Sequence, residues 1–426
     1  MPSLKLLFFL LIPAMLFAQQ HSVLTAKTKA ETVESICRSL LDSYIFPDTA
    51  KKMADKLRKR IKEGAYNKIT DPVAFSDALT LDLYSIYQDR HMQVRYVQAT
   101  NPAVLENTIF SEDLYQRTVR ANFGLSKAEV LPGNIGYINI MNFWADNING
   151  RATVKAALQF VSHTNALIID LRNCGGGSQE TVALICGYFL EEPVLINRMF
   201  DRRDNTTTEF WARPDSTFTA VTKMPLYVLT SKKTFSAAEE FCYDLQNLER
   251  ATIVGEVTGG GAHGKFEQDL PHGFVISIPY SRAINPVSLS NWEGTGVQPH
   301  IVTTADAALE TAEMQILDDI LAKTTDKGDL FRLNWDRELL KAASNPITPE
   351  TAALQKFAGV YGERTVTFEN GKLFYQRAGR PKFEMEAMSA TMMKPKGNNY
   401  FKVEFKENSL TAYYQDNRVE TDVRTK

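Results

Sequence analysis

Cysteine, excess charge of one sign and long apolar segments are all scarce in this chain. The 426 residues include four cysteines, and 48 lysines and arginines stand against 50 aspartates and glutamates, for a formal net charge of −2. This balance argues against a nucleic-acid-binding surface, because phosphate binding needs clustered positive charge. The cysteines show neither a metal-ligand nor a redox spacing; they are Cys37, Cys174, Cys186 and Cys242. The sequence therefore implies no metal and no other cofactor, and it leaves open whether a disulfide forms.

A short charge-free apolar segment lies near the start of the chain. It runs over twelve residues from Leu6 to Phe17, after Lys5 and before the polar Gln19. A positive residue, a short apolar stretch and a small residue such as Ala18 predict a secretory signal over residues 1–18. A membrane anchor would need roughly 20 apolar residues. We therefore expect an exported protein, periplasmic or extracellular, with no membrane span after cleavage.

Residues 25–304 show two different patterns of apolar side chains, one after the other. Residues 25–95 place apolar side chains such as Val33 and Ile36 at three-and-four spacing, which predicts an N-terminal helical domain. Residues 96–304 alternate strand and helix patterns, which is typical of an α/β fold. Within them the apolar run Ala166–Leu171 predicts a strand buried on both faces of a largely parallel sheet.

Two further sequence patterns follow in the rest of the chain. Residues 305–345 predict a helical connector. Residues 346–426 contain short strand patterns separated by turn signals such as Asn370-Gly371, which predict a small C-terminal all-β accessory domain.

A glycine loop follows the predicted buried strand. Gly175, Gly176 and Gly177 are consecutive and precede a predicted helix. Glycines let the backbone approach a ligand closely and point N–H groups into one cavity, which would suit an oxyanion. Neither dinucleotide nor P-loop spacing is present, and a plain strand–helix turn is the alternative.

Ser236 lies at the predicted start of a helix, after the strand that ends near Thr230. A nucleophilic hydroxyl there would have helix-terminal amides beside the developing oxyanion. The alternative is a capping box, in which Ser236 caps the helix and Glu239 bonds back to it. The local pattern by itself favours the cap.

Two further residues are candidates for acid–base chemistry. His91 lies where a helix pattern gives way to a strand pattern, and Glu293 lies in a glycine-rich loop. Histidine is the usual general base, and a carboxylate can orient it as the acidic member of a serine triad. Taken alone, His91 is more often a junction residue than a base, and Glu293 is more often a surface carboxylate.

Five segments together resemble the tail-specific (C-terminal processing) serine peptidases, and especially their tricorn-core and interphotoreceptor-retinoid-binding-protein-like branch. In chain order they are IGYINI, ALIIDLRNCGGGS, TSKKTFSAAEEF, IVGEVTGGGAHGKF and WEGTGVQPHI. The resemblance covers roughly residues 25–304. It implies a ClpP/crotonase-like α/β catalytic core, and it does not explain the C-terminal β region.

The resemblance also implies roles for single residues. Ser236 matches the nucleophile, and the amides of Ala237 and Gly176, with Gly175 as the alternative by one position, match the oxyanion hole. His91 matches the base and Glu293 the acid of the tricorn-like branch.

Three departures qualify the match. Gly261 stands where the processing branch has its catalytic lysine, which excludes a Ser–Lys dyad, and Lys265 lies four residues further on. Arg90 stands where tricorn has a helper serine directly before its histidine. The stretch between Val97 and Pro132, of about 35 residues, is too short for a PDZ domain, which puts tail capture by strand addition in doubt.

The expected function is therefore an exported serine peptidase that acts on peptides or proteins, with an oligomeric state that the sequence does not define. Two alternatives stay open, because a fold does not by itself define a function. One is a non-catalytic module that binds peptides or hydrophobic ligands, and the other is a different serine hydrolase such as an esterase. Lys265 and His263 are the next candidates for the base if His91 does not serve.

Overall fold

The computed structural model describes residues 24–97, 112–145 and 147–426. The predicted signal, residues 1–18, lies outside these residues. The chain divides into two compact units. The N-terminal unit comprises the described residues up to 97 together with Lys265–Tyr280, and the core unit comprises the rest.

Three helices and a small antiparallel sheet form the N-terminal unit. The helices are α1 (Ala26–Ser43), α2 (Pro47–Lys62) and α3 (Pro72–Tyr84). Their apolar faces are buried as the three-and-four spacing predicts, for example at Val33, Ile36 and Leu40. Asp71 caps α3 by accepting a hydrogen bond from the Ala74 amide at 2.7 Å.

A hairpin from later in the chain completes this unit. It consists of β9 (His263–Leu270), the short 3₁₀ turn η3 (Pro271–Gly273) and β10 (Phe274–Ile284). The first part of β10 pairs antiparallel with β1 (Gln93–Tyr96). Residues Lys265–Tyr280 of the hairpin belong to the N-terminal unit, and the ends of β9 and β10 belong to the core unit.

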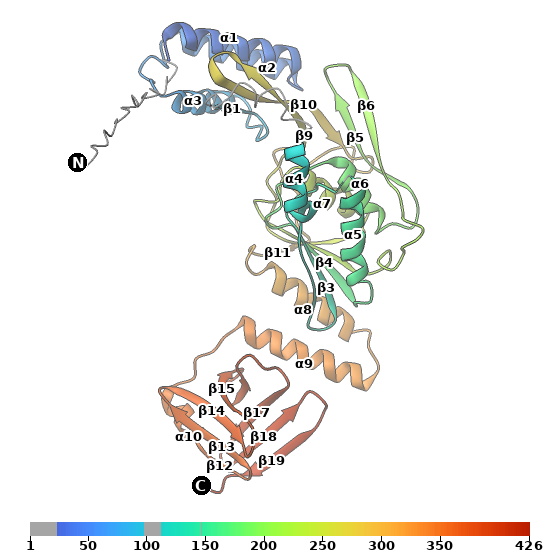
Figure 1. Cartoon of the computed structure of the whole chain (residues 1–426), viewed down its shortest axis with the longest axis vertical. Helices are drawn as coiled ribbons and strands as arrows, with labels where there is room; N and C mark the ends of the chain where they lie inside the picture. The colour runs from blue at the N-terminus through green and yellow to red at the C-terminus, as the bar shows by residue number, and fades with distance from the viewer. Residues whose placement is uncertain (1–23, 98–111, 146) are drawn as a thin grey trace, which may run out of the picture. The chain divides into compact units, whose positions relative to one another are not determined.

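A six-stranded sheet organises the core unit (Figure 1). Its order is β11-β8-β7-β4-β3-β2, and all neighbours are parallel except the β2–β3 pair. The strands are β2 (Leu125–Leu131), β3 (Ile135–Ile140), β4 (Ala166–Asp170), β7 (Leu226–Thr230), β8 (Thr252–Gly255) and β11 (Ile301–Val302). This is the predicted α/β architecture with a largely parallel sheet.

Helices cover both faces of this sheet. Leu167 and Ile169 of β4 pack in one apolar cluster with α5 (Ile148–Phe160), α6 (Gln179–Gly187) and α7 (Ala237–Asn247). Ala166 and Ile168 point to the opposite face and pack with α8 (Ala308–Leu321). Because strand side chains alternate between faces, both must be apolar here, which explains the continuous apolar run. Each such side chain contributes about 1.5–3 kcal/mol when fully buried.

The remaining elements of the core unit flank this sheet. A helix and a 3₁₀ turn precede β2. A hairpin of β5 and β6 follows α6, and the sequence patterns do not predict it. The last residues of β10, Ser281–Ile284, pair antiparallel with β5. These elements are α4 (Glu112–Arg120), η2 (Asn122–Gly124), β5 (Val194–Asp201) and β6 (Thr206–Ala212).

An antiparallel meander ends the chain, after α9 (Lys327–Ser344) and α10 (Thr351–Phe357). Its eight strands pair in chain order. They are β12 (Gly359–Tyr361), β13 (Arg364–Glu369), β14 (Lys372–Arg377), β15 (Lys382–Ala387), β16 (Met392–Pro395), β17 (Phe401–Lys406), β18 (Ser409–Tyr414) and β19 (Val419–Val423).

The meander closes on itself. The Val360 amide donates to the Lys426 carbonyl at 3.0 Å, and the Thr425 amide donates to the Val360 carbonyl at 2.8 Å, so the chain end pairs with the first strand. Closure removes the exposed sheet edges. Apolar and aromatic side chains fill the interior.

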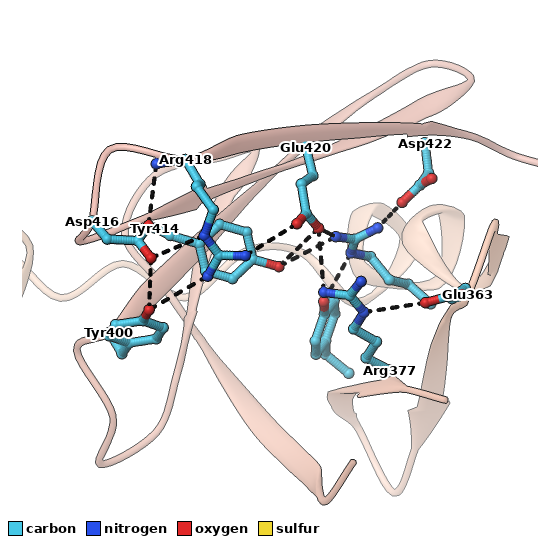
Figure 2. A network of polar contacts seen from close by, with 10 residues as sticks. Glu363, Arg377, Tyr400, Tyr414, Asp416, Arg418, Glu420 and Asp422 are labelled. Atoms are coloured by element: carbon cyan, nitrogen blue, oxygen red, sulfur yellow. Dashed lines mark hydrogen bonds and ion pairs between the residues drawn. The ribbon is translucent and has the colours of Figure 1, made fainter. Parts of the chain in front are cut away.

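Charged side chains reinforce the seam. Figure 2 shows Glu420 accepting hydrogen bonds from Arg377 and Arg418, both at 3.3 Å, and from the Tyr414 hydroxyl at 3.2 Å. The buried Arg364 on β13 pairs with both Glu420 and Asp422 on β19. A buried arginine needs such partners, because an unpaired buried charge is costly.

Helix α9 contacts the β barrel through Trp335 and Glu338. The Trp335 indole N–H donates to the Asn399 carbonyl at 3.0 Å. The Lys402 ammonium lies 4.4 Å from the centroid of the same ring and pairs with Glu338. The barrel therefore has a core of its own and a small, identifiable contact with the helix.

We predict that a chain ending at Pro346 stays folded and still cleaves short peptides, because the barrel is closed and packs its own core. Trp335→Gln should accompany the truncation, since removal of the barrel exposes this ring. Circular dichroism, melting temperature and the turnover of a short peptide would test this. A soluble, folded truncation without short-peptide cleavage would show that the barrel belongs to the catalytic machinery.

Candidate active site

Ser236 lies in a sharp turn between a buried strand and a helix. β7 ends at Thr230, and α7 begins at Ala237, directly after the serine. The Ser236 backbone has φ 58° and ψ −124°, whereas a serine that only caps a helix normally has an extended backbone. Positive φ strains a residue other than glycine, and a strained strand-to-helix turn is typical of a nucleophile elbow. Capping alone does not explain this conformation.

Gly176 lies directly against this turn. Its φ of 104° is in the region that glycine favours. A Cβ at this position would come within 2.8 Å of the Phe235 carbonyl oxygen, 2.9 Å of the Ser236 Cβ and 3.0 Å of the Ala237 nitrogen. A Cβ on Gly175 would meet nothing within 4 Å. Of the two glycines left open by the sequence, Gly176 is therefore the one in contact with the serine turn.

Hydrogen bonds join the serine turn to the segment that leads into the glycine loop. Three of them use side-chain hydroxyls or amides of the turn and backbone carbonyls of that segment. They run from Ser231 Oγ to Arg172 at 2.5 Å, from Thr234 Oγ1 to Leu171 at 2.8 Å and from the Phe235 amide to Cys174 at 3.1 Å. The position of the glycine loop thus depends on side chains of the turn as well as on its own backbone.

Asp170 anchors the start of the same segment. Its carboxylate accepts hydrogen bonds from the Tyr137 hydroxyl at 2.7 Å and from the Arg172 guanidinium at 2.6 Å. Burial raises the pKa of this carboxyl, but the bonds from Arg172 and Tyr137 outweigh burial, so the pKa is lowered overall. Arg172 also donates to the Ala305 carbonyl at 2.7 Å. Asp170 is therefore a positioning carboxylate for the loop.

Glu239 connects the serine turn to a second glycine-rich loop. Its side chain is 0% exposed. Oε2 accepts from the Ser236 amide at 2.8 Å and the Gly261 amide at 2.9 Å, and Oε1 accepts from the Gly260 amide at 2.6 Å and the Thr258 hydroxyl at 2.5 Å. Burial raises the pKa of Glu239, and these four hydrogen bonds lower it only in part.

Glu293 joins the opposite side of that loop. Several contacts hold the two segments together: Glu293 Oε2 accepts from the Ala262 amide at 2.6 Å, the Gly294 amide donates to Gly260 at 3.1 Å, and the Trp292 indole donates to Gly261 at 2.8 Å. His263 is adjacent, with Nδ1 at 3.6 Å from Glu293 Oε2. Only 6% of the Glu293 side chain is exposed, so it is not a surface carboxylate.

His91 belongs to the N-terminal unit and lies at the predicted junction, between α3 and β1. Its backbone amide donates to Asp89 Oδ1 at 3.0 Å, and the Tyr44 hydroxyl donates to Asp89 Oδ2 at 3.3 Å. Asp89 therefore holds the turn that carries His91. Lys265, also of this unit, has its ammonium 3.8 Å from Glu267 with 44% of its side chain exposed.

Three features of this region went unpredicted. One is the bridging role of Glu239, of which the capping-box pattern showed only one half. The second is the contact of His263 with Glu293, for which the sequence carries no signal. The third is a pair of buried carboxyls on α7, Glu240 and Asp244, whose pKa values burial raises.

The four cysteines are free and buried. Burial raises the pKa of the Cys174 thiol, beside the glycine loop, to about 12, so this thiol stays protonated at neutral pH. The question of a disulfide is thereby settled for this structure.

A strained serine at a helix start, with a glycine loop packed against it, is the arrangement of a serine hydrolase. Residues 134–303 match the family model for peptidase family S41, and residues 15–132 match the model for the N-terminal domain of peptidase S41 in eukaryotic IRBP. The chain belongs to the S41 peptidases, the tail-specific serine peptidase family that its motifs resemble.

Two curated relatives carry names that describe processing at a carboxyl terminus. The carboxyl-terminal-processing peptidase 2, chloroplastic, of Arabidopsis thaliana is 29% identical over 196 residues, which cover 44% of this chain and 36% of that protein. The carboxyl-terminal-processing protease of Synechocystis sp. is 35% identical over 158 residues, or 36% of this chain and 35% of that protein. The chain thus spans about a third of each relative's length.

A solved structure of a protein from Parabacteroides merdae shares the fold. Its TM-score is 0.51 at 20% identity, and the match covers 68% of this chain and 96% of that one. Together with the family match, this confirms the predicted fold class: a ClpP/crotonase-like core with an N-terminal helical part and a C-terminal all-β part. Among the residues that the structure describes, no helix is both long and apolar enough to cross a bilayer.

We predict that Gly176→Ala abolishes hydrolysis, whereas Gly175→Ala retains most of it. A methyl group at position 176 must displace the serine turn, while one at position 175 enters open space. The rate of labelling by a fluorophosphonate probe and peptide turnover, with melting temperatures for both variants, would measure this. Equal activities in the two variants would remove Gly176 from the site.

Proposed function

We propose that the chain is an exported serine peptidase that hydrolyses peptide bonds through an acyl-enzyme. Ser236 is the nucleophile, His91 the general base and Glu293 the acid that orients it. The observation that carries the proposal is the strained Ser236 backbone with Gly176 packed against it. A helix cap needs neither feature.

Acyl transfer follows directly from these assignments. Ser236 Oγ attacks the peptide carbonyl carbon as His91 takes the hydroxyl proton, and the carbonyl oxygen becomes an oxyanion. The Gly176 and Ala237 amides stabilise this oxyanion, and each such donor contributes about 2.7–4 kcal/mol to the transition state. The peptide C–N bond then breaks as His91 gives its proton to the leaving amine. Water, activated by the same histidine, releases the acyl group and restores the serine.

The assignment of His91 requires the N-terminal unit to bring this residue to the serine, because the two residues belong to different units. Closure between the units would then gate activity. Glu293 would hold the imidazole tautomer and stabilise the imidazolium. The names of the curated relatives favour protein carboxyl termini as the substrate class.

We predict that Ser236→Ala and His91→Ala each abolish peptide hydrolysis to a similar degree, because the members of a triad act as a unit. Folding should be largely unaffected, as judged from melting temperature. Thr25→Ala is the matched control for a purely capping residue, since the Thr25 hydroxyl accepts from the Thr28 amide at 3.1 Å. It should lower stability by about 0.5–2 kcal/mol and spare turnover.

Other outcomes would assign other functions. Turnover of esters but not peptides would indicate an esterase, and absence of fluorophosphonate labelling in the wild type would indicate a binding module. If His91→Ala keeps near-wild-type turnover while Lys265→Ala loses it, Lys265 is the base. Mass spectrometry of a digested peptide library would define the cleaved bond.

We also predict that the chain is cleaved after Ala18 when it is made in a host with a secretory pathway. Leu10→Arg, in the middle of the apolar stretch, should block both cleavage and export. The measurement is the N-terminal residue of the purified protein by mass spectrometry, with cell fractionation. An intact Met1 terminus in a cytosolic fraction would refute export.

A further inference from the structure

Glu293 Oε2 faces two groups of the loop that leads into β9. The Ala262 amide donates to it at 2.6 Å, and His263 Nδ1 lies 3.6 Å away. The side chains of His263 and Glu293 are 1% and 6% exposed. Little of this contact is therefore screened by solvent.

The backbone that carries His263 is firmly held. The Ala283 amide donates to the Ala262 carbonyl at 3.1 Å, just before the histidine. Just after it, a Cβ on Gly264 would come within 2.2 Å of the Ser281 hydroxyl oxygen, so the chain packs closely there. Together with the Gly260 and Gly261 amides on Glu239, these contacts restrain the backbone from which the imidazole projects.

We propose that His263 is a positioning residue for the peptidase reaction, which orients the Glu293 carboxylate. The inference rests on the proposed function, because it deepens the role assigned to Glu293. A carboxylate that is held in one orientation can in turn hold the imidazole of a serine triad in its catalytic tautomer. In this account His263 acts only through Glu293 and touches no reacting atom.

Two variants test which imidazole nitrogen matters. His263→Asn places an amide N–H near the position of Nδ1, whereas His263→Gln places one near the position of Nε2. Asparagine and glutamine are both polar and no larger than histidine, so the two variants form a matched pair. We expect His263→Asn to keep kcat within about threefold of the wild-type value. We expect His263→Gln to lower kcat about 10- to 100-fold, because a small misplacement in an active site can cost about a hundredfold in rate. KM should stay within about twofold of wild type in both variants.

Kinetics should be expressed per active site, counted by fluorophosphonate labelling of Ser236. This count separates a slower reaction from a smaller folded fraction, and melting temperatures record any change in stability. A merely structural role would lower the labelled fraction in both variants and leave kcat per labelled site unchanged, and that result would overturn the proposal. Equal kcat in the Asn and Gln variants would overturn it too.

A double-mutant cycle tests the route through Glu293. In a Glu293→Gln background, His263→Gln should lower kcat by less than about twofold, because a residue that acts only through another loses its effect when the other is removed. A full additional loss in that background would overturn the proposal. If His263→Asn is as inactive as Ser236→Ala, His263 is itself the base, which also overturns it. Failure of the wild type to label or cleave would instead refute the proposed function.

Discussion

The buried carboxylate of Glu239 is the interaction on which the rest of the site depends. It accepts four hydrogen bonds, from the serine turn on one side and from the Thr258–Gly261 loop on the other. Loss of this group would leave three buried backbone amides unsatisfied, at about 1–3 kcal/mol each. That penalty restricts the turn and the loop to one arrangement. The strained Ser236 backbone persists because its surroundings over-determine it.

The parallel sheet explains why these segments meet. The glycine loop follows β4, the serine turn follows β7, and the loop at Thr258 follows β8. These three strands are neighbours in the sheet. Parallel strands end at the same edge, and ligand sites in open α/β sheets form at the carboxyl ends of the strands. The site is therefore a consequence of strand order, and the loops supply the chemistry.

The residues proposed for catalysis lie in two separately packed units, and the C-terminal barrel has a core of its own. The proposed nucleophile and oxyanion loop lie on a sheet covered on both faces, the proposed base lies in a small helical unit, and the C-terminal barrel closes around its own apolar core. If the proposed triad is right, the reaction draws residues from both units.

Local patterns predicted a large part of this structure. The spacing of Val33, Ile36 and Leu40 predicted α1, and the apolar run Ala166–Leu171 predicted a strand covered on both faces. The β5–β6 hairpin escaped prediction because its side chains mix exposed threonines and charges with half-buried apolar groups, so that neither period dominates. The short strand patterns of residues 346–426 predicted an all-β domain, and the structure has an eight-stranded antiparallel sheet there.

The candidate site, like the fold, was predictable from sequence only in part. The resemblance of five segments to a peptidase family indicated Ser236, the glycine loop and Glu293 as candidates, whereas the local pattern around Ser236 alone favoured a helix cap. Only tertiary structure distinguished Gly176 from Gly175, since the two differ in what lies within 4 Å of them and not in chemistry. It also turned Glu239 from a capping residue into the bridge between two loops. The contact of His263 with Glu293 spans thirty positions, and no local period encodes a contact that depends on how strands from distant segments are ordered in a sheet.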